Sequence, residues 1–499
     1  MPIFKSNFNK RCFSTTTRVL STPYKIAIIG TGPGGFYTAH HLLNKSSSDK
    51  QIQLDFFEKL PTPFGLSRYG VAPDHPEVKN CESFMNDLMK DHGYKSNSKN
   101  RVRFLGNIEI GKDLSLKDLE NHYNSIVLAY GCTSSDNKLN IPGSNLPGII
   151  SARKFVNWYN GHPDCYEENN EYKPPPLDKI KNVSIIGNGN VALDVARILL
   201  ANPKTHWYPT DISVDAEKLL EKSAVKNVNI VARRGILESA FSNKEIRELF
   251  ELKDAKFKPL QQGLLESVST QKLGRVDKRK VGLIEKYNKP IQNLSPEDRT
   301  WSLQYFKSPV EFIANKDGSI AETKCVVNKS VNDPLLPGRI EPTDKIVSIK
   351  NDLVILSIGY QGTPIKGFDE IGIWFDNNKL HNQNGRVLST KTEGENDVNQ
   401  TYKKGWYTSG WIKNGPKGVI AVTMMDSFDT ASNILEDLSN GIHLEVDLNK
   451  DILDKIKDKE IVYWDNWENL NKFELDKGKE LGKSRYKVCE KDKMLKICE

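Results

Sequence analysis

Two stretches of the chain share one pattern, in which an apolar strand runs into a glycine turn and then into a helix. The first stretch covers residues 24–58 and ends in a second apolar strand closed by Glu58. Its leading strand, Ile26–Ile29, is almost unbroken in apolar residues, which is typical of a parallel strand buried on both faces. The turn fits the spacing G-x-G-x-x-G, with Gly30, Gly32 and Gly35.

This pattern predicts a dinucleotide site. The first glycine permits a tight turn, the second lets a pyrophosphate approach the backbone, and the third lets the helix pack on the strand. The helix aims its free N–H groups and its positive dipole end at the phosphates. A carboxylate at the end of the next strand, here Glu58, can accept hydrogen bonds from the ribose hydroxyls.

The second stretch begins with the strand Val183–Ile186 and enters a helix that runs to Leu200. Its turn has the G-x-G-x-x-A form, with Gly187, Gly189 and Ala192. The next strand, Val228–Ala232, ends in Arg233 and Arg234 where an NAD-binding protein has an acid. Guanidinium groups bind phosphate through paired hydrogen bonds, so the two arginines predict NADP rather than NAD.

Further apolar runs predict more strands and indicate how the two dinucleotide units are connected. Buried strands with a glycine end are expected at residues 123–131 and 352–360, and the second is expected to return the chain to the first dinucleotide unit. Residues 202–226 are longer than a usual connection and are interpreted as an insertion that carries a helix.

Two further helices are predicted from local patterns. The first is predicted over residues 238–250, where Ser242 and Glu245 have the spacing of a capping box. The second follows residue 418 and carries an apolar stripe at near-helical spacing, for which core packing is the favoured interpretation: Ala421, Met424, Met425, Phe428 and Ala431.

The composition argues against several classes of protein. Of the 499 residues 37% are hydrophobic and 27% are charged, and no stretch approaches the roughly 18 apolar residues of a membrane span. The formal charge of +7 is too mild to suggest nucleic acid but suits docking of an acidic protein. The seven cysteines include no C-x-x-C pair, which argues against a zinc site, a disulfide framework or a thiol redox pair.

Residues 1–22 differ from the rest of the chain. They are basic and rich in serine and threonine, and the first acidic residue of the chain is Asp49. This composition, without an apolar core, predicts a mitochondrial transit peptide rather than a secretory signal. A disordered basic tail is the alternative.

The segment after Glu58 carries a specific resemblance. Its motifs Pro63-Phe64-Gly65-Leu66 and Gly70-Val71-Ala72-Pro73-Asp74-His75-Pro76 resemble the mitochondrial ferredoxin (adrenodoxin) reductases. The resemblance covers about residues 24–485. It implies an α/β fold of the glutathione-reductase-like type with two Rossmann-like domains, in which an NADP-binding domain (135–350) is inserted into an FAD-binding domain (23–134 and 351–499).

The same resemblance implies a function. Such flavoprotein oxidoreductases pass electrons from NADPH through FAD to an acidic [2Fe-2S] ferredoxin, in support of iron–sulfur cluster assembly, haem modification or hydroxylases. The implied location is the mitochondrial matrix, at most peripheral to the inner membrane, and the implied state is a monomer. No nucleic acid or metal is implied.

Site residues follow from the motifs and the resemblance together. FAD contacts are expected from Gly30, Gly32, Gly34, Gly35, Glu58, Leu66, Ile110, Trp411, Gly418, Val419 and Ile420. NADP contacts are expected from Asn188, Gly189, Asn190, Val191, Arg233, Arg234, Glu245 and Gly418. The resemblance also implies that His75 and Asp194 interact across the domain interface as the catalytic pair.

The basic segment 266–290 leaves two interpretations open. Charge runs are usually solvated faces. Because the family's ferredoxins are acidic, the resemblance instead implies docking on Lys272, Arg275, Lys278, Arg279 and Lys280.

Other flavoprotein classes fit less well. A protein like the small subunit of glutamate synthase would carry an N-terminal cysteine-rich iron–sulfur segment, and this sequence has none. A flavin-binding sensor without turnover stays open as an alternative from another functional class.

Overall fold

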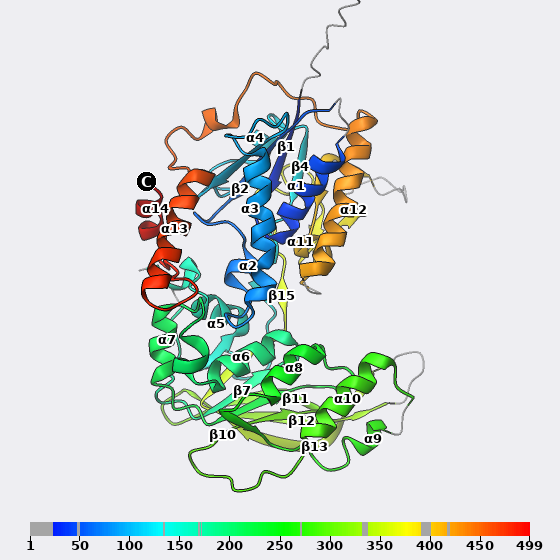
Figure 1. Ribbon diagram of the computed structural model, residues 1–499. Helices are drawn as coiled ribbons and strands as arrows, with labels where there is room; N and C mark the ends of the chain where they lie inside the picture. The colour runs from blue at the N-terminus through cyan, green and yellow to red at the C-terminus, as the bar shows by residue number, and fades with distance from the viewer. Residues whose placement is uncertain are drawn as a thin grey trace, which may run out of the picture.

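The computed structural model describes residues 23–46, 50–132, 135–167, 170, 172–269, 272–331, 338–390, 401–416 and 420–499. They form two lobes, each built on its own largely parallel sheet (Figure 1). The first lobe contains residues 23–132 and 362–499, and the second contains residues 137–358. The expected transit peptide, residues 1–22, lies outside the described residues, as do Gly418 and Val419.

The first lobe has a seven-stranded sheet in the order β18-β19-β20-β4-β1-β2-β3. Five neighbouring strands are parallel: β1 (Tyr24–Ile29), β2 (Ile52–Glu58), β3 (Arg101–Gly106), β4 (Ser125–Leu128) and β20 (Tyr402–Thr408). The antiparallel edge is formed by β18 (Asn382–Gln383) and β19 (Arg386–Leu388). The main helices are α1 (Pro33–Lys45), α2 (Leu66–Tyr69), α3 (Cys81–His92), α4 (Leu116–Glu120), α11 (Trp411–Asn414) and α12 (Ile420–Ser439).

The second lobe has a six-stranded parallel sheet in the order β6-β14-β7-β8-β10-β9. Its strands are β6 (Ile149–Ser151), β7 (Asn182–Ile186), β8 (Asn227–Val231), β9 (Ala255–Phe257), β10 (Arg299–Gln304) and β14 (Leu353–Leu356). Its helices are α5 (Ala152–Tyr159), α6 (Asn190–Leu200), α7 (Val214–Glu221), α8 (Asn243–Phe250), α9 (Glu266–Ser269) and α10 (Arg275–Tyr287).

A separate antiparallel sheet belongs to the second lobe. It consists of β11 (Lys307–Ala314), β12 (Ile320–Ser330) and β13 (Ile340–Lys350). This sheet was not predicted from the sequence. Its apolar residues Phe312, Ile320 and Cys325 pack with Ile186 and Val231 of the parallel sheet, so the two sheets share one core.

The lobes are joined by a short antiparallel ribbon of β5 (Ser135–Asp136) and β15 (Tyr360–Gln361). The expectation that residues 352–360 return to the first lobe is wrong, because β14 pairs with β6 and β7 inside the second sheet. The expected domain start at residue 351 is therefore too early. An apolar run suits the centre of either parallel sheet, and its composition does not say which.

Other local expectations have mixed outcomes. The insertion at 202–226 does carry helix, a π-helical turn (Pro203–Trp207) and α7. The helix predicted over 238–250 begins only at Asn243. The expected core stripe on α12 holds only in part: Ala431 is buried in the core, but Ala421 and Met425 are exposed. Hydroxyl side chains such as Thr423 and Ser427 face inward as well.

The end of the chain crosses back to the second lobe. After α13 (Trp464–Glu480), which packs on the first lobe, Lys483 Nζ pairs with Glu217 at 2.7 Å and Lys487 Nζ pairs with Asp211 at 3.0 Å. The chain ends with α14 (Lys491–Cys498). In the described part of the chain, the remaining short elements are the 3₁₀ turns Pro76–Asn80, Pro163–Cys165 and Ile452–Lys455, and the hairpin of β16 (Phe375–Asp376) and β17 (Lys379–Leu380).

Candidate active site

The first glycine turn has the shape that a dinucleotide requires. Gly30 has φ +101°, and a Cβ there would lie 2.6 Å from the Ala129 carbonyl oxygen. A Cβ at Gly35 would lie 2.2 Å from the Gly30 carbonyl oxygen, so this glycine lets α1 pack closely on β1. A Cβ at Gly32 would meet open space, which is where a pyrophosphate would approach the backbone. This part of the structure fits FAD.

Two further glycines shape the same cradle. Gly34 lies against Gly410, where a Cβ would come within 3.2 Å of the Gly410 Cα. Gly65 has φ +46° and faces Gly32, so the turn before α2 lies beside the open glycine. Leu66, an expected FAD contact, is half-buried directly after it.

Glu58 lies at the carboxyl end of β2 and is anchored to the glycine turn. Its Oε2 accepts hydrogen bonds from the Thr31 amide at 3.2 Å and the Thr31 hydroxyl at 2.6 Å, and its Oε1 accepts one from the Leu60 amide at 3.1 Å. A carboxylate has about four acceptor positions, so one remains for a ribose hydroxyl. Thr31 was not singled out from the sequence, although it lies within the G-x-G motif.

Other expected FAD residues lie in the same lobe. Ile110 is buried against Leu114, while Trp411 is half-buried and its ring stacks on Tyr360 with centroids 6.2 Å apart. Ile420 begins α12 and is half-buried.

The second glycine turn repeats the geometry of the first. Gly187 has φ +123°, and a Cβ there would lie 2.0 Å from the Ser357 carbonyl oxygen, whereas a Cβ at Gly189 would meet open space. Gly189 is the N-cap of α6 without a side-chain cap, which leaves the N–H groups of the first helical turn for a ligand phosphate. This turn fits a second dinucleotide.

The asparagines around Gly189 tie the turn to the segment before α8. Asn188 donates from Nδ2 to the Ser239 hydroxyl at 3.3 Å, and Asn190 Oδ1 accepts from the Ser242 amide at 2.8 Å. Val191 is half-buried next to them. These side chains therefore shape the turn.

Arg233 and Arg234 lie beside that turn. They follow β8, and the Gly187 amide donates to the carbonyl of Val231 at 2.9 Å, so the arginines and the glycine turn share one edge of the sheet. Arg233 is exposed and Arg234 is half-buried. Within the described part of the chain, neither guanidinium forms an ion pair with a carboxylate.

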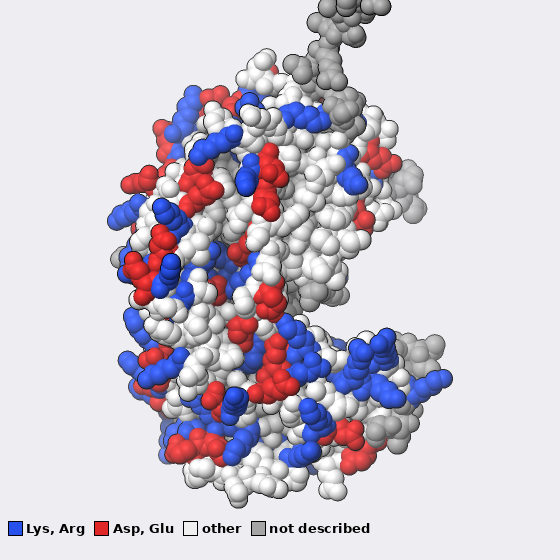
Figure 2. Space-filling model, in the orientation of Figure 1, with Lys and Arg blue, Asp and Glu red and all other residues white. Residues whose placement is uncertain are grey.

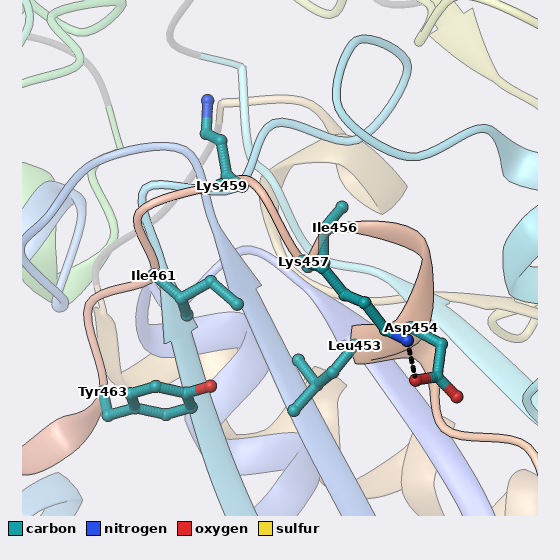
Figure 3. A pocket seen from close by; sticks show the side chains of 7 residues that line it. All are labelled: Leu453, Asp454, Ile456, Lys457, Lys459, Ile461 and Tyr463. Carbon is teal, nitrogen blue, oxygen red and sulfur yellow. Dashed lines mark ion pairs between the residues drawn. The ribbon is translucent and has the colours of Figure 1, made fainter.

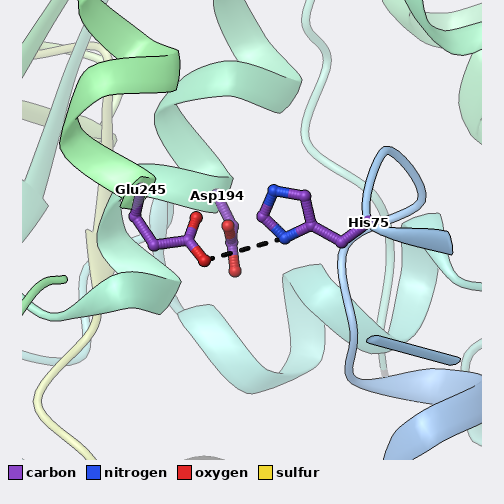
Figure 4. Close-up of side chains that lie close together, drawn as sticks. All are labelled: His75, Asp194 and Glu245. Atoms are coloured by element: carbon purple, nitrogen blue, oxygen red, sulfur yellow. Dashed lines mark ion pairs between the residues drawn. The ribbon is translucent and has the colours of Figure 1, made fainter. Parts of the chain in front are cut away.

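The two lobes meet at a cluster of ionisable groups (Figure 4). Ligand-type atoms of His75, Asp194 and Glu245 all lie within 4.8 Å of one another. His75 comes from the loop of the first lobe, while Asp194 and Glu245 come from α6 and α8 of the second. The structure therefore brings together the pair that the resemblance placed across the domain interface.

Arg197 supplies the positive charge of this cluster. Its guanidinium binds Asp194 at 2.9 Å, Asp74 at 2.9 Å and Glu245 at 3.1 Å, and it is almost fully buried. His75 Nε2 lies 2.7 Å from Glu248. Arg197 was missed from the sequence, although its position three residues after Asp194 on one helix places the two side chains together.

Burial sets the protonation of the cluster. It raises the pKa of Asp194 to about 7, although the Arg197 charge opposes the shift. Burial alone would also raise the pKa of Asp74, but hydrogen bonds from His206 and Arg197 hold that pKa well below its usual range. A buried acid near neutrality, beside a histidine, can hold or release a proton at physiological pH.

The structure shows how much of the capping box predicted at Ser242 and Glu245 forms. The Ser242 hydroxyl accepts from the Glu245 amide at 3.2 Å and caps α8, but the Glu245 carboxylate turns to Arg197 instead of returning to the cap. Only half of the capping box therefore forms. Its expected contact with NADP stays a prediction.

The basic segment divides between surface and interior. Lys272, Arg275, Lys278 and Arg279 are exposed, and Figure 2 shows Lys and Arg side chains gathered over α10 below a hollow between the lobes. Lys280 is different, because it is buried and its Nζ donates to the Ser239 carbonyl at 2.9 Å. The expectation that Lys280 docks a partner is wrong: it shares the inward face of α10 with Ile284.

A pocket of about 330 Å³ lies elsewhere, around residues 453–463 (Figure 3). Leu453, Ile461 and Tyr463 line it, and Lys457 at its rim pairs with Asp454 at 3.2 Å. None of the expected site residues lines this pocket.

Comparison with known proteins agrees with this geometry. Residues 24–256 match the pyridine nucleotide-disulphide oxidoreductase family. The structure of Mycobacterium tuberculosis FprA in complex with NADPH superposes with a TM-score of 0.81 at 31% identity, covering 96% of this chain and 100% of that one. No helix in the described part of the chain is long and apolar enough to cross a membrane.

Relatives cover nearly the whole chain. The protein named "Probable NADPH:adrenodoxin oxidoreductase, mitochondrial" in Saccharomyces cerevisiae is 39% identical over 93% of this chain and 94% of its own length. The NADPH:adrenodoxin oxidoreductase of Bos taurus is 37% identical over 98% of this chain and 94% of its own length. With these identities and two matching glycine cradles, this chain belongs to the mitochondrial NADPH:adrenodoxin oxidoreductase family.

Proposed function

We propose that this chain is a mitochondrial flavoprotein oxidoreductase that passes electrons from NADPH to a [2Fe-2S] ferredoxin. One observation carries the proposal: each lobe holds its own dinucleotide cradle, and the lobes meet at buried ionisable residues. FAD, when bound, supplies the chemistry that accepts two electrons as a hydride and releases them singly. The mitochondrial names of the relatives support the location.

The residues of the first lobe hold the flavin nucleotide in this proposal. Gly32 lets the pyrophosphate approach the backbone, and Glu58 accepts a hydrogen bond from a ribose hydroxyl while Thr31 fixes its carboxylate. In the second lobe Gly189 and the first turn of α6 bind the pyrophosphate of NADPH. Arg233 and Arg234 bind its 2′-phosphate.

The residues at the lobe interface orient the two cofactors and hold a proton. Arg197 fixes Asp194 and Glu245 of the second lobe against Asp74 of the first. Asp194, with its pKa raised by burial to about 7, holds or releases a proton beside His75. The interface also excludes water, since Arg197 is almost fully buried.

The partner docks on α10 in this proposal. Lys272, Arg275, Lys278 and Arg279 present unpaired positive charge on the described surface, which suits an acidic ferredoxin. Electrostatic attraction of this kind raises the association rate more than the affinity of the final contact.

An absorption experiment tests the proposed function. The purified protein should carry bound FAD, NADPH should bleach the flavin band, and a mitochondrial ferredoxin added next should restore it while its own cluster becomes reduced. Steady oxidation of NADPH that requires the ferredoxin would distinguish an enzyme from a flavin-binding sensor. Bleaching without any return of the flavin band on adding ferredoxin would refute the proposed acceptor.

A further inference from the structure

The turn that carries Arg233 and Arg234 is held from outside its own strand. The carbonyl of Ala232 accepts from the Lys307 amide at 3.0 Å, and that of Arg234 accepts from the Phe306 amide at 3.2 Å. The carbonyl of Arg233 accepts from the side-chain amide of Asn328, on β12, at 2.7 Å. All three carbonyls are therefore bound by the chain that leads into the antiparallel sheet or by that sheet itself.

Asn328 is built into this position. Its side chain is buried, and the same Nδ2 also donates to the Ser308 hydroxyl of β11 at 2.8 Å. Its own amide donates to the Phe306 carbonyl at 2.8 Å, and the pairing of β12 with β13 shifts register between Val326 and Asn328. The backbone bond to Phe306 and the irregular pairing of β12 fix where this side chain leaves the sheet, so its amide meets the Arg233 carbonyl.

The arginine side chains themselves have no such support. Arg233 is exposed, and within the described residues neither Arg233 nor Arg234 forms an ion pair. The direction in which they leave the turn is thus set by the backbone below them. A binding group gains most from a contact when its geometry is fixed before the ligand arrives.

We infer that Asn328 is the positioning residue that fixes the Arg233 turn for recognition of the 2′-phosphate of NADPH, and so a determinant of NADPH over NADH. The antiparallel sheet of the second lobe then contributes to the choice of coenzyme by holding the backbone of the Arg233 turn in place. This inference rests on the proposed role of Arg233 and Arg234, and it adds a residue outside the dinucleotide fold.

The test compares coenzymes in the FAD-loaded protein with ferricyanide as acceptor. Asn328→Ala should raise the KM for NADPH about tenfold, a change of about 1.4 kcal/mol, with kcat and the KM for NADH near their wild-type values. Asn328→Asp keeps the shape but loses the donor, so it should shift the same ratio even if the alanine variant folds poorly. Ser308→Ala is the matched control: it removes the other bond of the same amide and should leave the ratio unchanged.

A second set of variants distinguishes the role of Asn328 from the proposed phosphate contact of Arg233. In a protein that already carries Arg233→Ala, Asn328→Asp should have no further effect on the KM for NADPH, because the group that it positions is absent. If both Asn328 variants raised the KM for NADPH and NADH equally, or Ser308→Ala matched them, the inference would be overturned. If Arg233→Ala itself left coenzyme choice unchanged, the proposed phosphate contact would fail instead.

Discussion

Replacing Asp194 by asparagine should make the protein more stable at alkaline pH than the wild type. Burial raises the pKa of Asp194 from 3.8 to about 7, so the folded protein keeps a proton that the unfolded chain releases near pH 4. The folded state then binds more protons between these values, and the free energy of unfolding falls as pH rises through that window. Asparagine has no proton to lose but keeps an oxygen that can accept from Arg197.

The size of the effect follows from linkage. At about 1.4 kcal/mol for each pKa unit, the titration of Asp194 costs at most about 4 kcal/mol in all. Between pH 5 and pH 8 the loss is about 2–3 kcal/mol. His75, Asp74, Arg197 and Glu245 all face the same carboxylate, and they are present in both proteins. The difference between the variant and the wild type removes the part that they share.

The assay is urea unfolding of FAD-loaded wild type and Asp194→Asn at several values of pH. The free-energy difference in favour of the variant should grow by about 2–3 kcal/mol from pH 5 to pH 8. Asp87→Asn, an exposed carboxylate on α3, is the control and should show no such trend. A flat difference would refute the raised pKa, and a difference that turns against the variant would mean that an ionised Asp194 stabilises the fold through Arg197.

Three further predictions concern the cofactors and the partner. Reversal of Arg275 and Arg279 to glutamate should slow the reduction of ferredoxin and weaken the salt dependence of that rate, while the reduction of ferricyanide stays near normal. Lys316→Glu, on the β11–β12 turn, is the charge control. An equal loss of rate with both acceptors would contradict docking on α10. Replacement of Arg233 and Arg234 by alanine should weaken NADPH about ten- to hundredfold for each phosphate contact of about 1.5–3 kcal/mol and leave NADH nearly unchanged, as measured by KM. Glu58→Gln, which keeps the shape, should lower FAD retention through dialysis without changing NADP⁺ binding, and stoichiometric flavin in the dialysed variant would make the ribose contact unimportant.

The glycine turns were predictable from the sequence because their physics is local. The positive φ of Gly30 and Gly187 and the close approach of Gly35 to the Gly30 carbonyl belong to the motifs themselves, although the backbone that Gly30 and Gly187 face, at Ala129 and Ser357, lies far along the chain. A motif of fixed spacing therefore carries most of the information. The buried strands were found for the same reason, through their unbroken apolar runs.

The placement of β14 and the cluster around Arg197 depended on longer-range information. An apolar strand carries no sign of which parallel sheet accepts it, and His75 meets Asp194 only because the lobes pack together. Lys280 is an intermediate case. Its charge suggested a docking role, but its spacing to Ile284 places it on the buried face of α10, so helical periodicity would have removed it from the docking set.

The crossing of the chain end explains how two lobes with separate sheets hold one geometry. Lys487 Nζ donates to the Arg68 carbonyl of the first lobe at 2.9 Å and pairs with Asp211 of the second at 3.0 Å. Burial lowers the pKa of Lys487 to about 7 against the opposing effect of Asp211, so this contact is expensive to form and adds little net stability. A buried charge that is satisfied in only one arrangement nevertheless penalises every other arrangement of the lobes. In the proposed function a hydride passes between cofactors held on different lobes. An interface with one permitted geometry serves that reaction better than an apolar interface on which the lobes could shift.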